Sequence, residues 1–273
     1  MVAGPAEPHL VRGDLGVAAR SGRANRRLPV IAFVHYTDTH MLDAQSPARV
    51  EFLDRYPPAF SAAFRPQETL TTQITDAMVR TTNAIARGPV SGRALEFTMC
   101  TGDNIDNAQF NEQRWFIDLL DGRAVRPDSG DPAKYEGIQD QESSTYDIHY
   151  WHPDGTPPGK VDDNPRTLFG YPVVPGLLEA ARRPFVAAGL DMPWFAAFGN
   201  HDPLLQGNVG PNPAFTAIAV GGTKVVSLPG NVSPDDVANS FQQGDPAVLQ
   251  AMLTVPGRPV TPYANRRPLE RSR

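Results

Sequence analysis

The sequence predicts an α/β protein in which helices flank a mixed β-sheet. Three apolar runs of strand length, residues 30–37, 95–101 and 193–198, alternate with segments of helical periodicity. An order of strand, helix, strand, helix is typical of α/β folds. Each run is followed within two residues by aspartate or asparagine, with histidine close by after the first and third, and open α/β sheets bind ligands at the carboxyl ends of their strands. We therefore expect a polar site along that edge of the sheet.

The first two runs have the composition of buried strands. Residues 30–37 are almost unbroken in apolar character, which predicts a strand covered on both faces of the sheet. The second run contains Cys100, the single cysteine of the chain. Thiols in apolar surroundings stay protonated, so we expect Cys100 to be buried and inert.

Two helices are predicted between the runs. The first places four apolar residues on one face, Leu70, Ile74, Met78 and Ile85. Gly88-Pro89 stops it. The second helix has Asn107 as its cap and ends near Leu120, before Gly122. The apolar stripe of the first helix is typical of helices that bury one side.

Weaker patterns surround the third run. A short helix is predicted over residues 176–183, kinked or restarted at Pro184. Residues 217–226 resemble a β-hairpin with Gly221-Gly222 at its turn. Ser233 is the expected cap of another short helix, with a proline at its first position.

The domain boundaries follow from composition. We expect a flexible N-terminal arm over residues 1–28, one domain over 29–260 with an insertion at 122–175, and a charged, solvated tail over 261–273. In the insertion, His149 and His152 flank a tyrosine and a tryptophan. These histidines line a pocket or bind a further metal, or else they pack the insertion onto the body.

Composition excludes several classes of protein. Of the 273 residues, 40% are hydrophobic and 20% charged, which is typical of a folded globular chain. The net charge of −5 argues against nucleic acid as a partner, because binding its backbone needs clustered positive charge. No apolar run approaches the ~20 residues of a membrane-spanning helix. The chain as given contains no export signal, and we expect export only if such a signal precedes it.

The polar residues after the three runs form a candidate metal site. Asp38 and His40 follow the first run, Asp103 the second and Asn200 the third. Carboxylate, imidazole and amide donors together suit divalent Mn, Fe, Co, Ni or Zn. A shared carboxylate lets two cations about 4 Å apart hold a hydroxide and a phosphoryl group. We expect Asp103 to bridge them, with Asp38 and His40 on one metal and Asn200 on the other.

Two further residues are candidates for proton transfer. His201 follows Asn200 directly, and a histidine beside a bound phosphate can protonate the leaving oxygen. Asp106, three positions after Asp103, is expected to orient its ring. Three arginines, Arg49, Arg55 and Arg123, are expected on the surface rather than on a phosphate.

Three segments together resemble the calcineurin-like metallophosphoesterase superfamily: Asp38-Thr39-His40, Gly102-Asp103-Asn104-Ile105-Asp106 and Gly199-Asn200-His201-Asp202. The resemblance covers residues 29–205, and the wide spacing is similar to a long-insert bacterial branch. It implies a two-layer sheet sandwich and hydrolysis of a small phosphoester. It also implies two divalent metals, Mn, Fe or Zn, with the ligands and roles given above.

The chain departs from the family in one respect. Members complete the site with later histidines, whereas the last histidine here is His201. The strands that close the sandwich in the family are missing too, so we expect an uncovered sheet face or edge. Either the chain is part of a longer protein or it is a degenerate member. The second alternative makes it a non-catalytic module that binds a partner or one metal weakly.

Overall fold

The computed structural model describes residues 13–16, 21–22, 24–57, 60–142, 144–243, 245, 247–252, 254–255 and 257–269. Residues 1–12, 17–20 and 23 of the predicted arm lie outside this range, as do residues 270–273 of the predicted tail.

A parallel sheet of three strands lies at the centre of the fold. Its order is β1-β2-β5, and its strands are Val34–Tyr36, Thr98–Cys100 and Trp194–Ala196. Each strand lies inside one of the three apolar runs, in the parallel arrangement that brings their carboxyl ends to one edge. Two antiparallel pairs make the fold mixed: β3 (Ala124–Val125) with β4 (Phe185–Val186), and β6 (Thr223–Lys224) with β7 (Arg258–Pro259). The predicted α/β class is confirmed.

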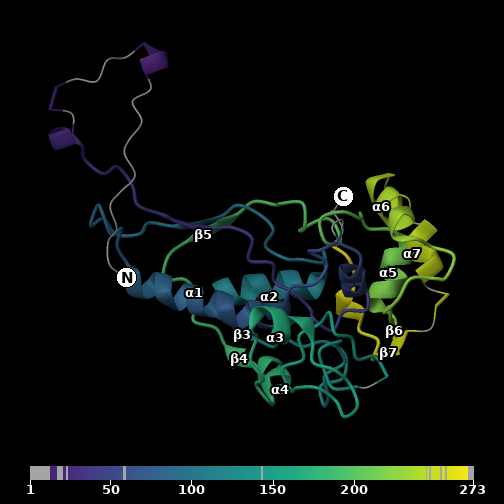
Figure 1. Cartoon of the computed structure of the whole chain (residues 1–273). Coiled ribbons are helices and arrows are strands. Elements are labelled where there is room, and N and C mark those ends of the chain that lie inside the picture. The colour runs from purple at the N-terminus through teal and green to yellow at the C-terminus, as the bar shows by residue number, and fades with distance from the viewer. Residues whose placement is uncertain are drawn as a thin grey trace.

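One face of the sheet carries the first hydrophobic core. Helices α1 (Thr71–Ile85) and α2 (Phe110–Leu120) lie side by side there, as Figure 1 shows. Tyr36 and Cys100 point from the strands into this core and meet the aromatic and aliphatic side chains of α2. Cys100 is buried as predicted, and burial raises the pKa of its thiol to about 11. The cysteine is therefore an inert core residue.

The opposite face of the sheet is uncovered in the described part of the chain. Phe33 and Phe195 are 50% and 55% exposed. They pack only along the sheet, where Phe33 stacks on Phe97 with ring centroids 5.1 Å apart. The prediction of strands covered on both faces is therefore wrong for this range, and the expected bare sheet face is present. An apolar strand can be half-exposed when nothing packs above it.

Helix α1 buries a different side from the predicted one. Ile74, Met78 and Ile85 of the apolar stripe are exposed, while the side that carries Val79 and Thr82 faces inward. Tyr36 and Thr82 share a hydrogen bond between their hydroxyls of 2.6 Å, and Asp76 accepts 2.8 Å from the amide of Ala188. Buried polar groups need partners, and these bonds orient the helix where its apolar stripe alone does not.

A second core lies at the other end of the molecule. It joins residues 48–53 to α5 (Pro213–Val220), α6 (Pro234–Gln243) and α7 (Ala247–Met252), which are grouped on the right of Figure 1. The predicted hairpin at 217–226 is wrong, since most of its first half belongs to α5. Asn212 caps that helix by accepting from the amide of Phe215 at 2.9 Å. A short apolar run does not by itself distinguish a strand from a buried helix.

The predicted start of α6 is confirmed. Ser233 Oγ accepts from the amide of Asp236 at 3.1 Å, and the Asp236 carboxylate accepts in return from the amide of Ser233 at 2.8 Å. This reciprocal pair satisfies two amides at the helix end that lack a partner within the helix.

Both histidines of the insertion have hydrogen-bond partners within it. It contains α3 (Asn164–Phe169) and leads into α4 (Leu177–Ala181), after which the chain enters β4 rather than restarting a helix at Pro184. His152 is fully buried, with its ring nitrogens 2.7 and 3.0 Å from the carbonyls of Asp140 and Asp147. His149 bonds the Asp147 carboxylate at 2.7 Å. These bonds all stay within the insertion, so they do not decide between the two alternatives. None of the described helices is long and apolar enough to cross a membrane.

Residues 261–269 are not a solvated tail. Arg266 is fully buried, and its guanidinium donates to Ser129 Oγ at 2.8 Å and to the Thr261 carbonyl at 3.0 Å. It also lies 3.4 Å from the buried Asp43 carboxylate. The charged sequence of this segment predicts exposure to solvent. The buried Asp43 carboxylate, however, requires a cation, and Arg266 supplies it.

Replacing Arg266 with alanine is expected to lower the free energy of unfolding by about 3–5 kcal/mol, because Asp43 is left buried without its cation. Urea denaturation measures the change. The neighbouring Arg267 is exposed and only stacks on Phe110, so Arg267→Ala is a matched control with an expected loss below about 1 kcal/mol. Equal losses in both variants would show that the buried pair contributes nothing special.

Candidate metal centre

The loops after β1 and β2 are joined along their backbones. The amide of Asp38 donates to the carbonyl of Gly102 at 3.2 Å, and that of His40 to the carbonyl of Asp103 at 2.9 Å. These bonds continue the pairing of the two strands beyond the sheet. They bring the first two predicted motifs side by side at the carboxyl edge.

The third loop fits against the second because both contain glycine. Gly102 has a φ of 113°, and a side chain there would place its Cβ 2.4 Å from the amide nitrogen of Gly199. At Gly199 an added Cβ would lie 2.2 Å from Asp103 Oδ1. Only glycine allows backbones to approach this closely. The two glycines therefore determine where the Asp103 carboxylate lies.

Backbone strain is concentrated at the same edge. Among the described residues other than glycine, six have positive φ, and four of them line one pocket: Asp38, His40, Asp103 and Gln206. Left-handed backbone costs of order 1–3 kcal/mol at such residues and persists where the surroundings impose it. This concentration indicates that the loops are held for their side chains.

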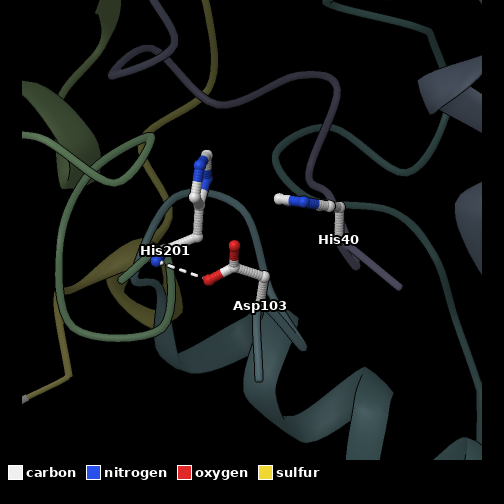
Figure 2. Close-up of side chains that lie close together, drawn as sticks. All are labelled: His40, Asp103 and His201. Carbon is white, nitrogen blue, oxygen red and sulfur yellow. Dashed lines mark hydrogen bonds between the residues drawn. The ribbon is translucent and has the colours of Figure 1, made fainter. Parts of the chain in front are cut away.

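His40, Asp103 and His201 form one cluster, shown in Figure 2. Each offers one ligand atom, and these atoms all lie within 4.8 Å of one another. The two imidazole rings meet edge to face, with centroids 4.6 Å apart. Asp103 Oδ1 accepts from the backbone amide of His201 at 2.9 Å, the dashed line in Figure 2. Three residues from three strand ends thus converge on one point.

Asp38 lies beside this cluster rather than within it, and Asn200 belongs to the same pocket. Asp38 Oδ1 is 3.6 Å from His40 Nε2, with its side chain 58% exposed. Asn200 is exposed too and lines the same pocket, with its amide nitrogen close to Gly207. The group of three thus holds two of the four residues predicted as ligands, and it includes the predicted acid.

Asp106 is fully buried beneath the two histidines. Its Oδ1 accepts from His40 Nδ1 at 2.9 Å and lies 3.2 Å from His201 Nδ1. Arg49 and Arg65 donate to the same carboxylate at 2.9 and 2.7 Å. Burial acts to raise the pKa of Asp106, but the histidines and arginines outweigh it and hold that pKa well below its usual value. The low pKa favours the charged carboxylate, which lies against both rings.

His201 is prepared to carry a proton. Burial acts to lower the pKa of its imidazole, but Asp106 and then Asp103 raise that pKa above its ordinary value. Its Nδ1 is buried and has no hydrogen-bond partner in good geometry among the described residues. His40 differs, because its Nδ1 is bonded to Asp106 and its Nε2 faces the cluster side near Asp38.

The guanidinium groups beneath the site were not predicted from the sequence. Arg49, expected on the surface, is fully buried and bonds Glu68 as well as Asp106. Arg65 pairs with the same two carboxylates. One signal was available, since Arg49 and Glu51 are opposite charges set among the apolar residues of segment 48–53. Charges within an apolar segment are buried when they are paired.

The cluster opens into a pocket of about 580 Å³. Its lining includes Asp38, His40, Asp103, Asn200 and His201, together with apolar residues of segment 50–63 and Ala238 of α6. This volume lies in the range of small-molecule sites, about 300–1,000 Å³.

The donor set fits a divalent cation. A histidine whose second nitrogen is anchored by a carboxylate is the usual arrangement of a metal ligand. His40 has this arrangement through Asp106, and Asp103 adds an oxygen donor within the same cluster. His201 adds a second imidazole to the same cluster. Mixed nitrogen and oxygen donors are those that Mn, Fe and Zn accept.

Comparison of the chain with family models, with characterised proteins and with solved structures finds no match.

Proposed function

We propose that this protein is a metal-dependent phosphoester hydrolase of the calcineurin-like kind, with that family's sandwich architecture. One observation carries the proposal: three parallel strand ends bring His40, Asp103 and His201 within one 4.8 Å cluster. The resemblance of the motifs and the strained loops that hold them support the same conclusion.

Two divalent cations, Mn, Fe or Zn, would be held at this edge. Asp38 and His40 would bind the first, Asn200 the second, and Asp103 would bridge them. The closeness of Asp38 Oδ1 to His40 Nε2, 3.6 Å, supports the first pair. When bound, such cations lower the pKa of water and neutralise charge on a phosphoryl group.

His201 would supply the proton. Asp106 and Asp103 raise the pKa of its imidazole, which favours the protonated ring, and the departing alkoxide of a phosphoester needs a proton. Asp106, held as an anion by Arg49 and Arg65, orients the ring and stabilises its charged form. The chain's own residues thus perform proton delivery, and a small ester fits the pocket.

One observation favours a second candidate function. Across the described histidine, cysteine, aspartate and glutamate side chains, a single group of three has metal-binding geometry, and Asp38 lies outside it. Three ligands suffice for one cation. A non-catalytic module that binds one metal would have this appearance.

Metal analysis and hydrolysis together test the proposal. The protein, loaded with Mn²⁺, Fe²⁺ or Zn²⁺, is expected to bind two cations and to hydrolyse p-nitrophenyl phosphate or bis(p-nitrophenyl) phosphate. On an alkyl phosphate such as β-glycerophosphate, whose leaving alkoxide needs a proton, His201→Ala is expected to lower kcat by about 10²–10⁴-fold, and on the p-nitrophenyl esters by less. His149→Ala is the matched control, because His149 also pairs with an aspartate but lies in the insertion. One bound cation without turnover would support the binding module instead.

A further inference from the structure

The pocket over the cluster contains one permanent cation. Among its described lining residues, Arg65 is the single arginine or lysine, against three aspartates, Asp38, Asp103 and Asp106. Its NH2 group lies 2.7 Å from Asp106 Oδ1, the oxygen that also anchors His40. The guanidinium of Arg65 and the imidazole of His40 therefore bond the same oxygen atom.

Arg65 shares two of the carboxylates beneath the site, Glu68 and Asp106, with Arg49. Arg49 already donates to Asp106 at 2.9 Å and also bonds Glu68, and it is fully buried. Arg65 adds a second guanidinium to the same pair through its Nε and NH2, and 30% of its side chain stays exposed. No hydrogen bond of its NH1 is found within the described ranges. This arrangement leaves a fixed cation with N–H groups available to the pocket.

We propose that Arg65 binds the phosphoryl group of the substrate and makes the site prefer phosphomonoesters over phosphodiesters. This inference rests on the proposed function. A phosphomonoester carries up to two negative charges near neutral pH and a diester carries one, so a fixed guanidinium favours the monoester. The pairing with Asp106 and Glu68 holds the guanidinium in place, so little conformational entropy is lost when it binds an anion.

Steady-state kinetics of the metal-loaded protein tests the assignment. In Arg65→Gln, KM for p-nitrophenyl phosphate and the inhibition constant of inorganic phosphate are each expected to rise about 10- to 100-fold, the contribution of a charged hydrogen bond. For bis(p-nitrophenyl) phosphate, which carries one negative charge rather than two, KM is expected to rise less than it does for the monoester. Arg65→Lys keeps the charge and is expected to restore part of the phosphate affinity.

Arg55→Gln is the matched control. Arg55 has the same 30% exposure as Arg65 and pairs with an aspartate, but it does not line the pocket. Its replacement is expected to leave both substrates and phosphate inhibition unchanged.

The outcomes separate the assignment from the proposed function. If Arg65 merely positions Asp106, Arg65→Gln lowers kcat equally for both substrates and leaves phosphate inhibition unchanged, and the inference is overturned. Equal activity of the unmodified protein on both esters also overturns it. Absence of metal and of all turnover in the unmodified protein contradicts the proposed function itself. If Arg65→Gln does not fold, Arg65→Lys decides by the same ratio of KM values.

Discussion

Replacing Asp106 with alanine is expected to lower the free energy of unfolding by about 3–5 kcal/mol, because it leaves Arg49 buried without one of its partners. His40 and His201 lose their common anchor in the same step. Turnover of a phosphoester is expected to fall with them, by at least the ~10-fold that loss of an outer partner of a metal ligand produces. Urea denaturation measures the first effect and steady-state kinetics the second.

Asp147→Ala is the matched control, since Asp147 also pairs with an arginine and a histidine, Arg55 and His149. Arg55 is partly exposed, so the expected loss is below about 1 kcal/mol. The dependence of the free energy of unfolding on pH gives a second test. Asp106 has a lowered pKa in the folded protein, so its contribution is complete above about pH 4, the unfolded value, and is lost as the pH falls through the folded value. Asp106→Asn should therefore lose stability less steeply in acid. An equal slope in both proteins would contradict the assigned charge.

Replacing Asp103 with asparagine is expected to weaken binding of the divalent cations by more than about 100-fold and to abolish measurable hydrolysis. Loss of an outer partner already weakens metal sites by about 10- to 100-fold, and Asp103 is assigned as the bridging ligand itself. The amide keeps the size of the side chain, and its oxygen can still accept from the amide of His201. Calorimetric titration with Mn²⁺ and Zn²⁺ measures the change.

Asp118→Asn provides the comparison for Asp103→Asn. Asp118 is a partly exposed aspartate of α2 that pairs with Arg114 outside the pocket, so cation affinity should not change. Unaltered stoichiometry and affinity in Asp103→Asn would remove Asp103 from the site and leave His40 and His201 without the oxygen donor on which the proposal depends.

Some elements were readable from local pattern alone. The positions of β1, β2 and β5 follow from three apolar runs, and the cap at Ser233 from a hydrogen-bonding side chain before a proline. Such signals are local, because hydrophobic runs and caps depend on neighbours within a few residues. Other elements were not readable. The apolar residues 217–220 are compatible with a strand as well as with the buried helix α5. Only packing against segment 48–53 decides between the two.

The sequence by itself determined that three strands end in aspartate, histidine and asparagine, and that parallel strands must bring these ends to one edge. Only the tertiary structure decided what lies beneath that edge. Arg49 and Arg65 come from an irregular segment with no period to read, and they meet Asp106 across 57 and 41 positions of the chain. Burial of a carboxylate demands cations, but which cations reach it is a property of the folded chain. The motifs contain the candidate metal ligands, and long-range ion pairs fix the positions of these side chains.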